Sequence, residues 1–262
     1  MNIAGIQKLT LVDFPGRVAA TVFTRGCSFR CGFCHNPELV LPEKFNPLLQ
    51  EKQIFDFLES RYGKLTGICI TGGEPCMQPD IDKFITHIKA LGFDVKLDTN
   101  GSFPDRLEKI IKDGDVDYIA MDIKAAFPKY WKTAGLINPK SEIRNPKQIQ
   151  SLEISKFGNS EIVSSFDISA SNLNRKIEKS INLIMESGVP YEFRTTVAHP
   201  LHEVADFEEI GKMIKGAEKY YIQNFVKSKQ INEAVEYRPF SDKELKDALK
   251  AIKPFVKSAE IR

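Results

Sequence analysis

The stretch VAATVFTRGCSFRCGFCHNPE, residues 18–38, begins as an apolar strand candidate and continues into a loop that holds three cysteines. Cys27, Cys31 and Cys34 are spaced C-x3-C-x2-C, and the chain has five cysteines in all. A disulfide framework uses an even number of dispersed cysteines, and a structural zinc site uses four ligands. Three thiolates on one short loop therefore favour a metal centre with three protein ligands and one open position.

The composition is that of a soluble globular protein, with 42% hydrophobic and 27% charged residues in a chain of 262. This length suits one large α/β domain or two small ones. A net charge of +2 without a basic run argues against nucleic-acid binding. No apolar run is long enough to span a membrane, and no signal-peptide pattern is present. The few, clustered cysteines indicate reduced thiols in the cytoplasm.

Strand and helix signals alternate along the chain. The expected strands are residues 18–23, 67–71, 94–99, 117–124, 191–197 and 219–226, and the expected helices are residues 53–63, 80–92, 105–113, 173–188, 204–216 and 241–255. We expect Asp80 and Ser241 to cap the starts of their helices, Gly92 to cap the end of the first, and residues 256–262 to form an edge strand. Six β–α units predict an incomplete, open (β/α)6 TIM-like barrel, with a flat doubly wound sheet as the alternative.

The residues of chemical interest follow the ends of the expected strands. The cysteine loop follows the first strand, GGEP the second and DTNG the third; DIK ends the fourth, and Arg194 lies in the fifth. In both candidate folds the carboxyl ends of parallel strands meet on one side, where active sites form. The positions of the motifs therefore agree with the predicted fold.

Residues 138–170 break this alternation. The segment is polar, shows neither helical nor strand periodicity, and is long for a loop in a compact domain. We interpret it as an insertion outside the barrel, such as a hairpin or a mobile flap, in an otherwise single domain covering residues 1–262. It serves either as a lid or partner-docking element, or as an insertion that the fold merely tolerates.

The cysteine loop favours an iron–sulfur cluster. A [4Fe–4S] cluster normally takes four cysteines, so three leave one iron open to a substrate or cofactor. His35 is discounted as a fourth ligand, because it adjoins Cys34 and adjacent residues rarely point at one metal. The alternative is a zinc site with Cys69 or Cys76 as its fourth ligand. Cys69 lies in an apolar strand, where a small buried side chain is expected, whereas Cys76 follows GGEP and is placed near the site.

The cysteine loop, followed by TGGEP at residues 71–75, resembles the radical S-adenosylmethionine (SAM) superfamily. The resemblance implies a [4Fe–4S] cluster on Cys27, Cys31 and Cys34, whose open iron chelates the amino and carboxylate groups of the SAM methionine. One electron from the cluster cleaves the sulfonium and yields a 5′-deoxyadenosyl radical, which abstracts hydrogen from a substrate.

The GGE turn fits the same cofactor. Gly72 and Gly73 let the backbone approach a ligand closely. Glu74 offers a carboxylate at the position where the family's motif meets the cationic amino group of SAM. Two glycines at the end of a strand usually mean only a turn, so the motif gains its meaning from the cysteine loop beside it.

A narrower resemblance connects LVDFPG, CHNPEL, DTNG, MDIKA and YEFRTTV with the glycyl-radical-enzyme activating proteins. The pattern is similar to activases of anaerobic ribonucleoside-triphosphate reductase, with pyruvate formate-lyase activases as near relatives. The resemblance implies that Asp98, Thr99 and Asp122 help to hold a monovalent cation beside the cofactor carboxylate, and that Lys124 binds the cofactor. Carboxylates facing a carboxylate cofactor need a cation between them, because like charges repel.

Other positions match the family less specifically. Asn36 matches a cofactor-contacting position, and Arg194 falls where an activase arginine approaches the site. Gln223 or Asn224 is expected to complete an adenosine pocket. Cys76 departs from the pattern, since related proteins more often carry another residue there.

These features predict an oxidoreductase that abstracts a hydrogen from a backbone glycine of a partner enzyme, anaerobic ribonucleotide reductase above all. The open barrel would admit the glycine loop of the partner, and the family implies flavodoxin or ferredoxin as electron donor. The alternatives are activation of a pyruvate formate-lyase type enzyme, radical chemistry on a small molecule as in 7-carboxy-7-deazaguanine synthase, and a metal-binding scaffold without catalysis.

Overall fold

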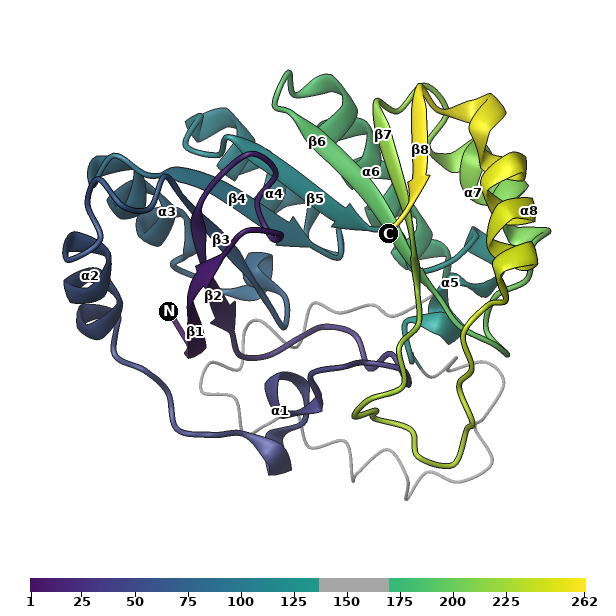
Figure 1. Cartoon of the computed structure of the whole chain (residues 1–262), viewed down its shortest axis with the longest axis horizontal. Helices are drawn as coiled ribbons and strands as arrows, with labels where there is room; N and C mark the ends of the chain where they lie inside the picture. The colour runs from purple at the N-terminus through teal and green to yellow at the C-terminus, as the bar shows by residue number, and fades with distance from the viewer. Residues whose placement is uncertain (137–169) are drawn as a thin grey trace.

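The computed structural model describes residues 1–136 and 170–262, and its core is one eight-stranded sheet (Figure 1). The strands are β1 (Ile3–Thr10), β2 (Ala19–Thr24), β3 (Gly67–Gly72), β4 (Asp94–Thr99), β5 (Tyr118–Asp122), β6 (Tyr191–Val197), β7 (Lys219–Asn224) and β8 (Ser258–Ile261). They lie side by side in chain order; β1 is antiparallel to β2, and every later pair is parallel. Because the order runs from β1 to β8 with an edge at each end, the barrel is open.

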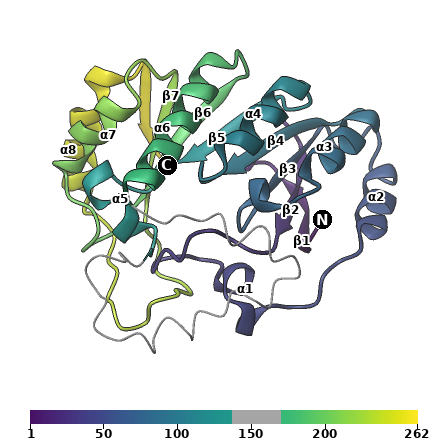
Figure 2. The same ribbon diagram turned by 180° about the vertical axis from the view of Figure 1, so that it is seen from behind.

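The helices follow the strands in alternation. They are α1 (Pro37–Val40), α2 (Glu51–Glu59), α3 (Ile81–Ala90), α4 (Pro104–Asp113), α5 (Phe127–Thr133), α6 (Ala170–Glu186), α7 (Asp206–Met213) and α8 (Asp242–Ile252), with 3-10 turns η1 (Pro42–Lys44), η2 (Pro75–Met77) and η5 (Lys253–Phe255). Helices α3, α4 and α6 lie behind the sheet in Figure 1 and in front of it in Figure 2, so they share one face. A doubly wound sheet would carry helices on both faces and reverse its strand order. The predicted incomplete (β/α)6 barrel is therefore confirmed.

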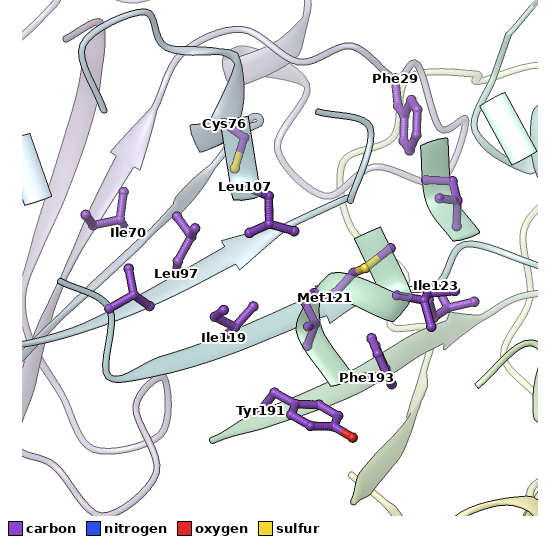
Figure 3. Packing of buried hydrophobic residues seen from close by; sticks show 14 of the residues in the cluster. Phe29, Ile70, Cys76, Leu97, Leu107, Ile119, Met121, Ile123, Tyr191 and Phe193 are labelled. Atoms are coloured by element: carbon purple, nitrogen blue, oxygen red, sulfur yellow. The ribbon is translucent and has the colours of Figure 1, made fainter. Parts of the chain in front are cut away.

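The two faces of the sheet differ in polarity because successive strand residues point to opposite sides. Leu97 of β4 and Ile119 of β5 are fully buried on the helical face, in one cluster with Leu107 of α4 (Figure 3). Burial of one such side chain contributes about 1.5–3 kcal/mol. Lys96 and Asp98 flank Leu97 in sequence and so point to the other, inner face. The inner face is where charged groups gather.

The sequence predicted most elements to within a few residues. The strands at 94–99 and 191–197 and the edge strand β8 are confirmed, whereas β1 and α5 were not predicted. Strand β1 is an edge strand whose middle residues are exposed or half-buried, so its sequence shows no clean alternation. Helix α5 has only seven residues, too few to show helical periodicity.

The predicted N-cap residues occupy the N-cap positions of both helices, but only Ser241 makes a capping bond. The hydroxyl of Ser241 accepts the N–H of Glu244, whose carboxylate in turn accepts the N–H of Ser241, which makes a capping box. Asp80 occupies the N-cap position of α3 without a capping bond, and its Oδ2 accepts the amino group of Met1 at 2.7 Å. Gly92 comes one residue after the actual C-cap of α3 and has a φ of +84°.

The predicted insertion at residues 138–170 lies almost wholly outside the described residues, so its fold and the single-domain prediction stay predictions. Within residues 1–136 and 170–262, no helix is both long enough and apolar enough to cross a bilayer.

Candidate active site at the carboxyl ends of the strands

The cysteine loop leaves the carboxyl end of β2 and brings its three thiols to one place. Cys27, Cys31 and Cys34 are free thiols, and Cys31 is buried. The N–H of Cys34 donates to the carbonyl of Cys31 at 3.0 Å, and the sulfur of Cys27 accepts the N–H of Phe29 at 3.4 Å. The amide of Asn100, at the end of β4, approaches the Cys27 sulfur at 3.6 Å. Loop and strand ends thus meet around the thiols.

Segments distant in sequence hold this loop in position. The N–H of Arg30 donates to the carbonyl of Ala134, after α5, at 2.8 Å. The carbonyl of Gly32 accepts the N–H groups of Ile231 and Asn232, in the β7–α8 connection, at 2.9 and 3.0 Å. This connection lies beside the cysteine loop in Figure 1. The loop is therefore preorganised by backbone hydrogen bonds from both sides.

Burial keeps the three thiols protonated in the metal-free chain. Burial raises the pKa of Cys27 to about 12 and that of Cys31 to about 11, and it also raises the pKa of Cys34. The negative charge of neighbouring thiolates raises the pKa values of Cys27 and Cys31 further. Such thiols become thiolates only when a cationic centre displaces their protons.

The three cysteines differ in arrangement from the ligands of a single bound ion. Among the residues that the structure describes, no three His, Cys, Asp or Glu side chains converge as ligands of one metal ion. A zinc site needs all its ligands within bonding distance of one point, whereas the cysteines of a [4Fe–4S] cluster bind separate irons. His35 packs its ring against Phe225, with 5.5 Å between the ring centroids.

The two glycines of the GGE turn allow two backbones to touch. Gly72 has a φ of +116°, and a Cβ there would lie 2.4 Å from the backbone nitrogen of Thr24. A Cβ on Gly73 would lie 1.9 Å from the carbonyl oxygen of Gly26. The glycines thus press the turn after β3 against the start of the cysteine loop. This contact places Glu74 next to the thiols.

Glu74 is fully buried and hydrogen-bonded by the strand ends around it. Its carboxylate accepts the hydroxyl of Thr99 at 2.7 Å and the N–H groups of Asn100 and Cys76 at 2.7 and 3.0 Å. Burial raises the pKa of Glu74 although these bonds oppose the rise. No ion pair found in the described part of the chain includes Glu74. A cationic group arriving here would gain a buried carboxylate as its partner.

A second charged group spans β4, β5 and β6. The guanidinium of Arg194 donates to Asp122 at 2.9 Å and to Asp98 at 3.2 Å. Lys96 also donates to Asp98, and Lys124 donates to Asp122 at 2.9 Å. Burial alone would raise the pKa of both aspartates, but the nearby cations outweigh it and hold both pKa values below the ordinary range.

Lys124 is positioned by a histidine that sequence reasoning missed. Asp122 raises the pKa of Lys124 against the opposing effect of burial, so the ammonium is stable. The carbonyl of Lys124 lies 2.8 Å from the Nε2 of buried His202, whose Nδ1 accepts the N–H of Ala198 at 3.2 Å. This pattern requires a proton on Nε2. A lone histidine in a loop has no sequence pattern that would have revealed it.

The remaining predicted residues lie in different places in the structure. Asn36 is exposed beside the cysteine loop, and its N–H faces the thiol of Cys34. Asn224 instead bonds the backbone of Phe240 with both ends of its amide, at 2.9 Å each, so its side chain serves the β7–α8 connection. Cys76 is buried beside Glu74, and Cys69 is buried on the inner face, 3.9 Å from the Lys96 ammonium. Lys96, Asn100 and His202 are additions to the predicted set.

Solved structures with the same fold include two proteins of low sequence identity to this chain. SuiB of Streptococcus suis bound to S-adenosylmethionine superposes with a TM-score of 0.60 at 12% identity, over 90% of this chain and 48% of SuiB. Archaeal TYW1 superposes with a TM-score of 0.51 at 11% identity, over 91% of this chain and 72% of TYW1. This chain thus spans about half the length of SuiB, and at these identities the likeness concerns the fold.

Curated relatives resemble the chain in sequence. A Methanocaldococcus jannaschii protein, provisionally named a glycyl-radical enzyme activating enzyme, is 29% identical over 99% of this chain and 95% of its own length. The pyruvate formate-lyase-activating enzyme of Clostridium pasteurianum is 34% identical over 47% of this chain and 52% of that enzyme. The predicted resemblance to glycyl-radical-enzyme activating proteins is confirmed.

The family model of the radical SAM superfamily matches residues 21–215, which include the cysteine loop, the GGE turn and the Asp98–Arg194 group. The match covers most of the chain. Together with the open barrel and the three clustered thiols, it implies a [4Fe–4S] cluster and S-adenosylmethionine as the cofactors of the site. The chain belongs to the radical SAM superfamily.

Proposed function

We propose that this chain is an activase that generates a glycyl radical on a partner enzyme, with anaerobic ribonucleoside-triphosphate reductase as that partner. The observation that carries the proposal is the resemblance along nearly the whole chain, 99% of it, to a protein named as a glycyl-radical enzyme activating enzyme. A partial match to pyruvate formate-lyase-activating enzymes supports a second candidate partner, an enzyme of the pyruvate formate-lyase type.

In this proposal each predicted residue has a physical role. Cys27, Cys31 and Cys34 hold the cluster, whose one-electron reductive cleavage of S-adenosylmethionine supplies the radical that removes the glycine hydrogen. Glu74 receives the amino group of the cofactor, because a buried carboxylate without an ionic partner gains most from a cation. Lys124 receives the carboxylate of the cofactor, since its ammonium is kept charged by its neighbour.

Several side chains act by positioning. Gly72 and Gly73 keep the GGE turn against the cysteine loop, and Thr99 orients Glu74. Arg194 holds two aspartates of neighbouring strands at a fixed separation. Asn36, at the rim, contacts the cofactor through its backbone or side chain. These roles require a rigid site, which the hydrogen bonds from distant segments provide.

The predicted electron donor, a reduced flavodoxin or ferredoxin, and the cytoplasmic location belong to the same proposal. Both are supported by the chemistry, because the cluster must be reduced at low potential and the thiols must remain unoxidised.

The decisive experiment is electron paramagnetic resonance of the anaerobically reconstituted and reduced protein, mixed with S-adenosylmethionine and the anaerobic ribonucleotide reductase of the same source. We expect a doublet near the free-electron g value, split by the remaining glycine α-hydrogen. The same mixture with a pyruvate formate-lyase type enzyme is the comparison. Cofactor cleavage without a doublet on either partner would refute the glycyl-radical activity while leaving radical SAM chemistry intact.

A further inference from the structure

Lys96 is a fully buried lysine that the predicted cofactor set does not include. It lies in β4, two residues before Asp98, so both side chains point to the inner face of the barrel. Its side chain is 1% exposed, and its ammonium donates to Asp98 and lies 3.9 Å from the sulfur of Cys69. Burying an ammonium is costly unless a buried opposite charge needs it.

Where β4, β5 and β6 end, the charged side chains balance the cofactor carboxylate when Lys96 is counted. Asp98 and Asp122 carry two negative charges, and the carboxylate of S-adenosylmethionine adds a third. Lys96, Arg194 and Lys124 carry three positive charges on the same group of strands. Without Lys96, the three carboxylates would outnumber the cationic side chains of this group by one.

The next acidic residue on the inner face has its own partner. Glu192 is buried, and Arg262 donates to both of its oxygens at 3.1 and 3.3 Å. Its nearest approach to Arg194 is longer, at 3.9 Å. The balance of three charges against three is therefore not disturbed by Glu192.

The carboxylate oxygens expected to bind a monovalent cation are already bound by protein cations. One oxygen of Asp98 accepts Lys96 and the other accepts Arg194. One oxygen of Asp122 accepts Arg194 and the other accepts Lys124. A potassium or sodium ion would have to share each of the four oxygens with an ammonium or a guanidinium that is already bound there.

The hydroxyl expected to complete such a cation site is also engaged. Thr99 donates to Glu74 at 2.7 Å and accepts the N–H of Gly101 at 3.1 Å. The Thr99 hydroxyl is therefore engaged by the GGE turn and by the backbone of its own strand end. The donor set predicted for the cation is present in the chain, but its members serve other partners.

We propose that Lys96, together with Arg194, supplies from within the protein the positive charge that a bound monovalent cation would otherwise supply beside the cofactor carboxylate. S-adenosylmethionine then binds to this chain without potassium or sodium. The inference rests on the cofactors of the proposed function and is independent of the partner enzyme. Lys96 acts as a positioning residue, since it meets the cofactor only through Asp98.

The test measures the affinity of the cluster-loaded protein for S-adenosylmethionine in potassium, sodium or choline chloride at equal ionic strength. The unaltered protein should bind equally in all three salts. In Lys96→Met, which keeps the length of the side chain but removes its charge, binding should weaken about tenfold in choline, or roughly 1.4 kcal/mol. Potassium should restore most of that loss by entering beside Asp98.

Two control variants separate this role from simple destabilisation. Lys52→Met removes an exposed lysine, 78% accessible and paired with Asp56, and should leave binding unchanged in every salt. The double variant Lys96→Met/Asp98→Asn should lose the potassium response, because the carboxylate that would hold the ion is gone. A merely structural lysine would give a weakened variant with no response to potassium.

Crystals soaked in rubidium chloride give a second measurement that needs no cofactor. An anomalous peak beside Asp98 is expected in Lys96→Met and not in the unaltered protein. A rubidium peak in the unaltered protein would overturn the proposal, and so would a need for potassium when the unaltered protein binds S-adenosylmethionine. Both results hold even if the Lys96→Met variant does not fold. Absence of cofactor binding in all salts would count against the proposed function, and the rubidium result would still decide the inference.

Discussion

Replacing Arg194 with methionine should destabilise the metal-free protein strongly. The guanidinium is 14% exposed and bridges Asp98 and Asp122, which are 13% and 31% exposed. Removing one partner of a buried ion pair costs about 3–5 kcal/mol. Each aspartate keeps a lysine partner and some contact with water, so we expect the lower end of that range. A loss of about 3 kcal/mol lowers the Tm of a chain of this size by roughly 6–12 °C.

The loss should depend on pH in a defined direction. Both aspartates have native pKa values below their ordinary range, so the stability they contribute is present above the unfolded-state pKa and is lost as pH falls through the native pKa. The difference between the unaltered protein and Arg194→Met should therefore be largest near neutral pH. It should shrink below about pH 4, where the unfolded carboxyl groups bind protons.

Urea unfolding followed by circular dichroism, repeated across this pH range, measures the effect. Lys112→Met is the matched control, because Lys112 is 72% exposed and pairs with Glu108 on the same helix. Such a surface pair is worth at most about 1 kcal/mol. A loss below about 1 kcal/mol in Arg194→Met, or a loss that stays constant from neutral to acid pH, would refute the bridging role.

Three further outcomes follow from the geometry. Gly73→Ala should lower the iron and sulfide content after reconstitution, because its Cβ would lie 1.9 Å from the Gly26 carbonyl; Gly5→Ala, with nothing within 4 Å, should retain full content. Glu74→Gln should weaken S-adenosylmethionine binding about tenfold or more by calorimetry, since the buried carboxylate becomes neutral; unchanged affinity would remove Glu74 from the cofactor site. Ser241→Ala should cost about 1 kcal/mol in thermal unfolding through loss of the cap, and an accompanying change in iron content would contradict its purely local role.

The order of apolar and polar residues along the chain was sufficient to predict the architecture. Residues 94–99 alternate a buried apolar position with inner polar ones, and this period of two defined β4 to the residue. The cysteine spacing and the GGE turn likewise identified the cluster loop, because their chemistry depends on neighbours in sequence. Strand β1 and helix α5 escaped prediction because β1 has an exposed middle without alternation and α5 is too short to show a helical period.

The sequence by itself predicted the open barrel and three candidate cluster cysteines from local periodicity and short spacings, and it predicted the superfamily through the resemblance of its motifs. Only the tertiary structure decided which charged groups meet. Thr99 serves Glu74, 25 residues away, and Arg194 reaches Asp98, 96 residues away. Lys96 looked like one polar residue of an alternating strand; its partner Asp98 lies two residues further along that strand, but only the packed sheet brings Arg194 to the same carboxylate. Such partnerships arise from the register between strands, which no single segment specifies.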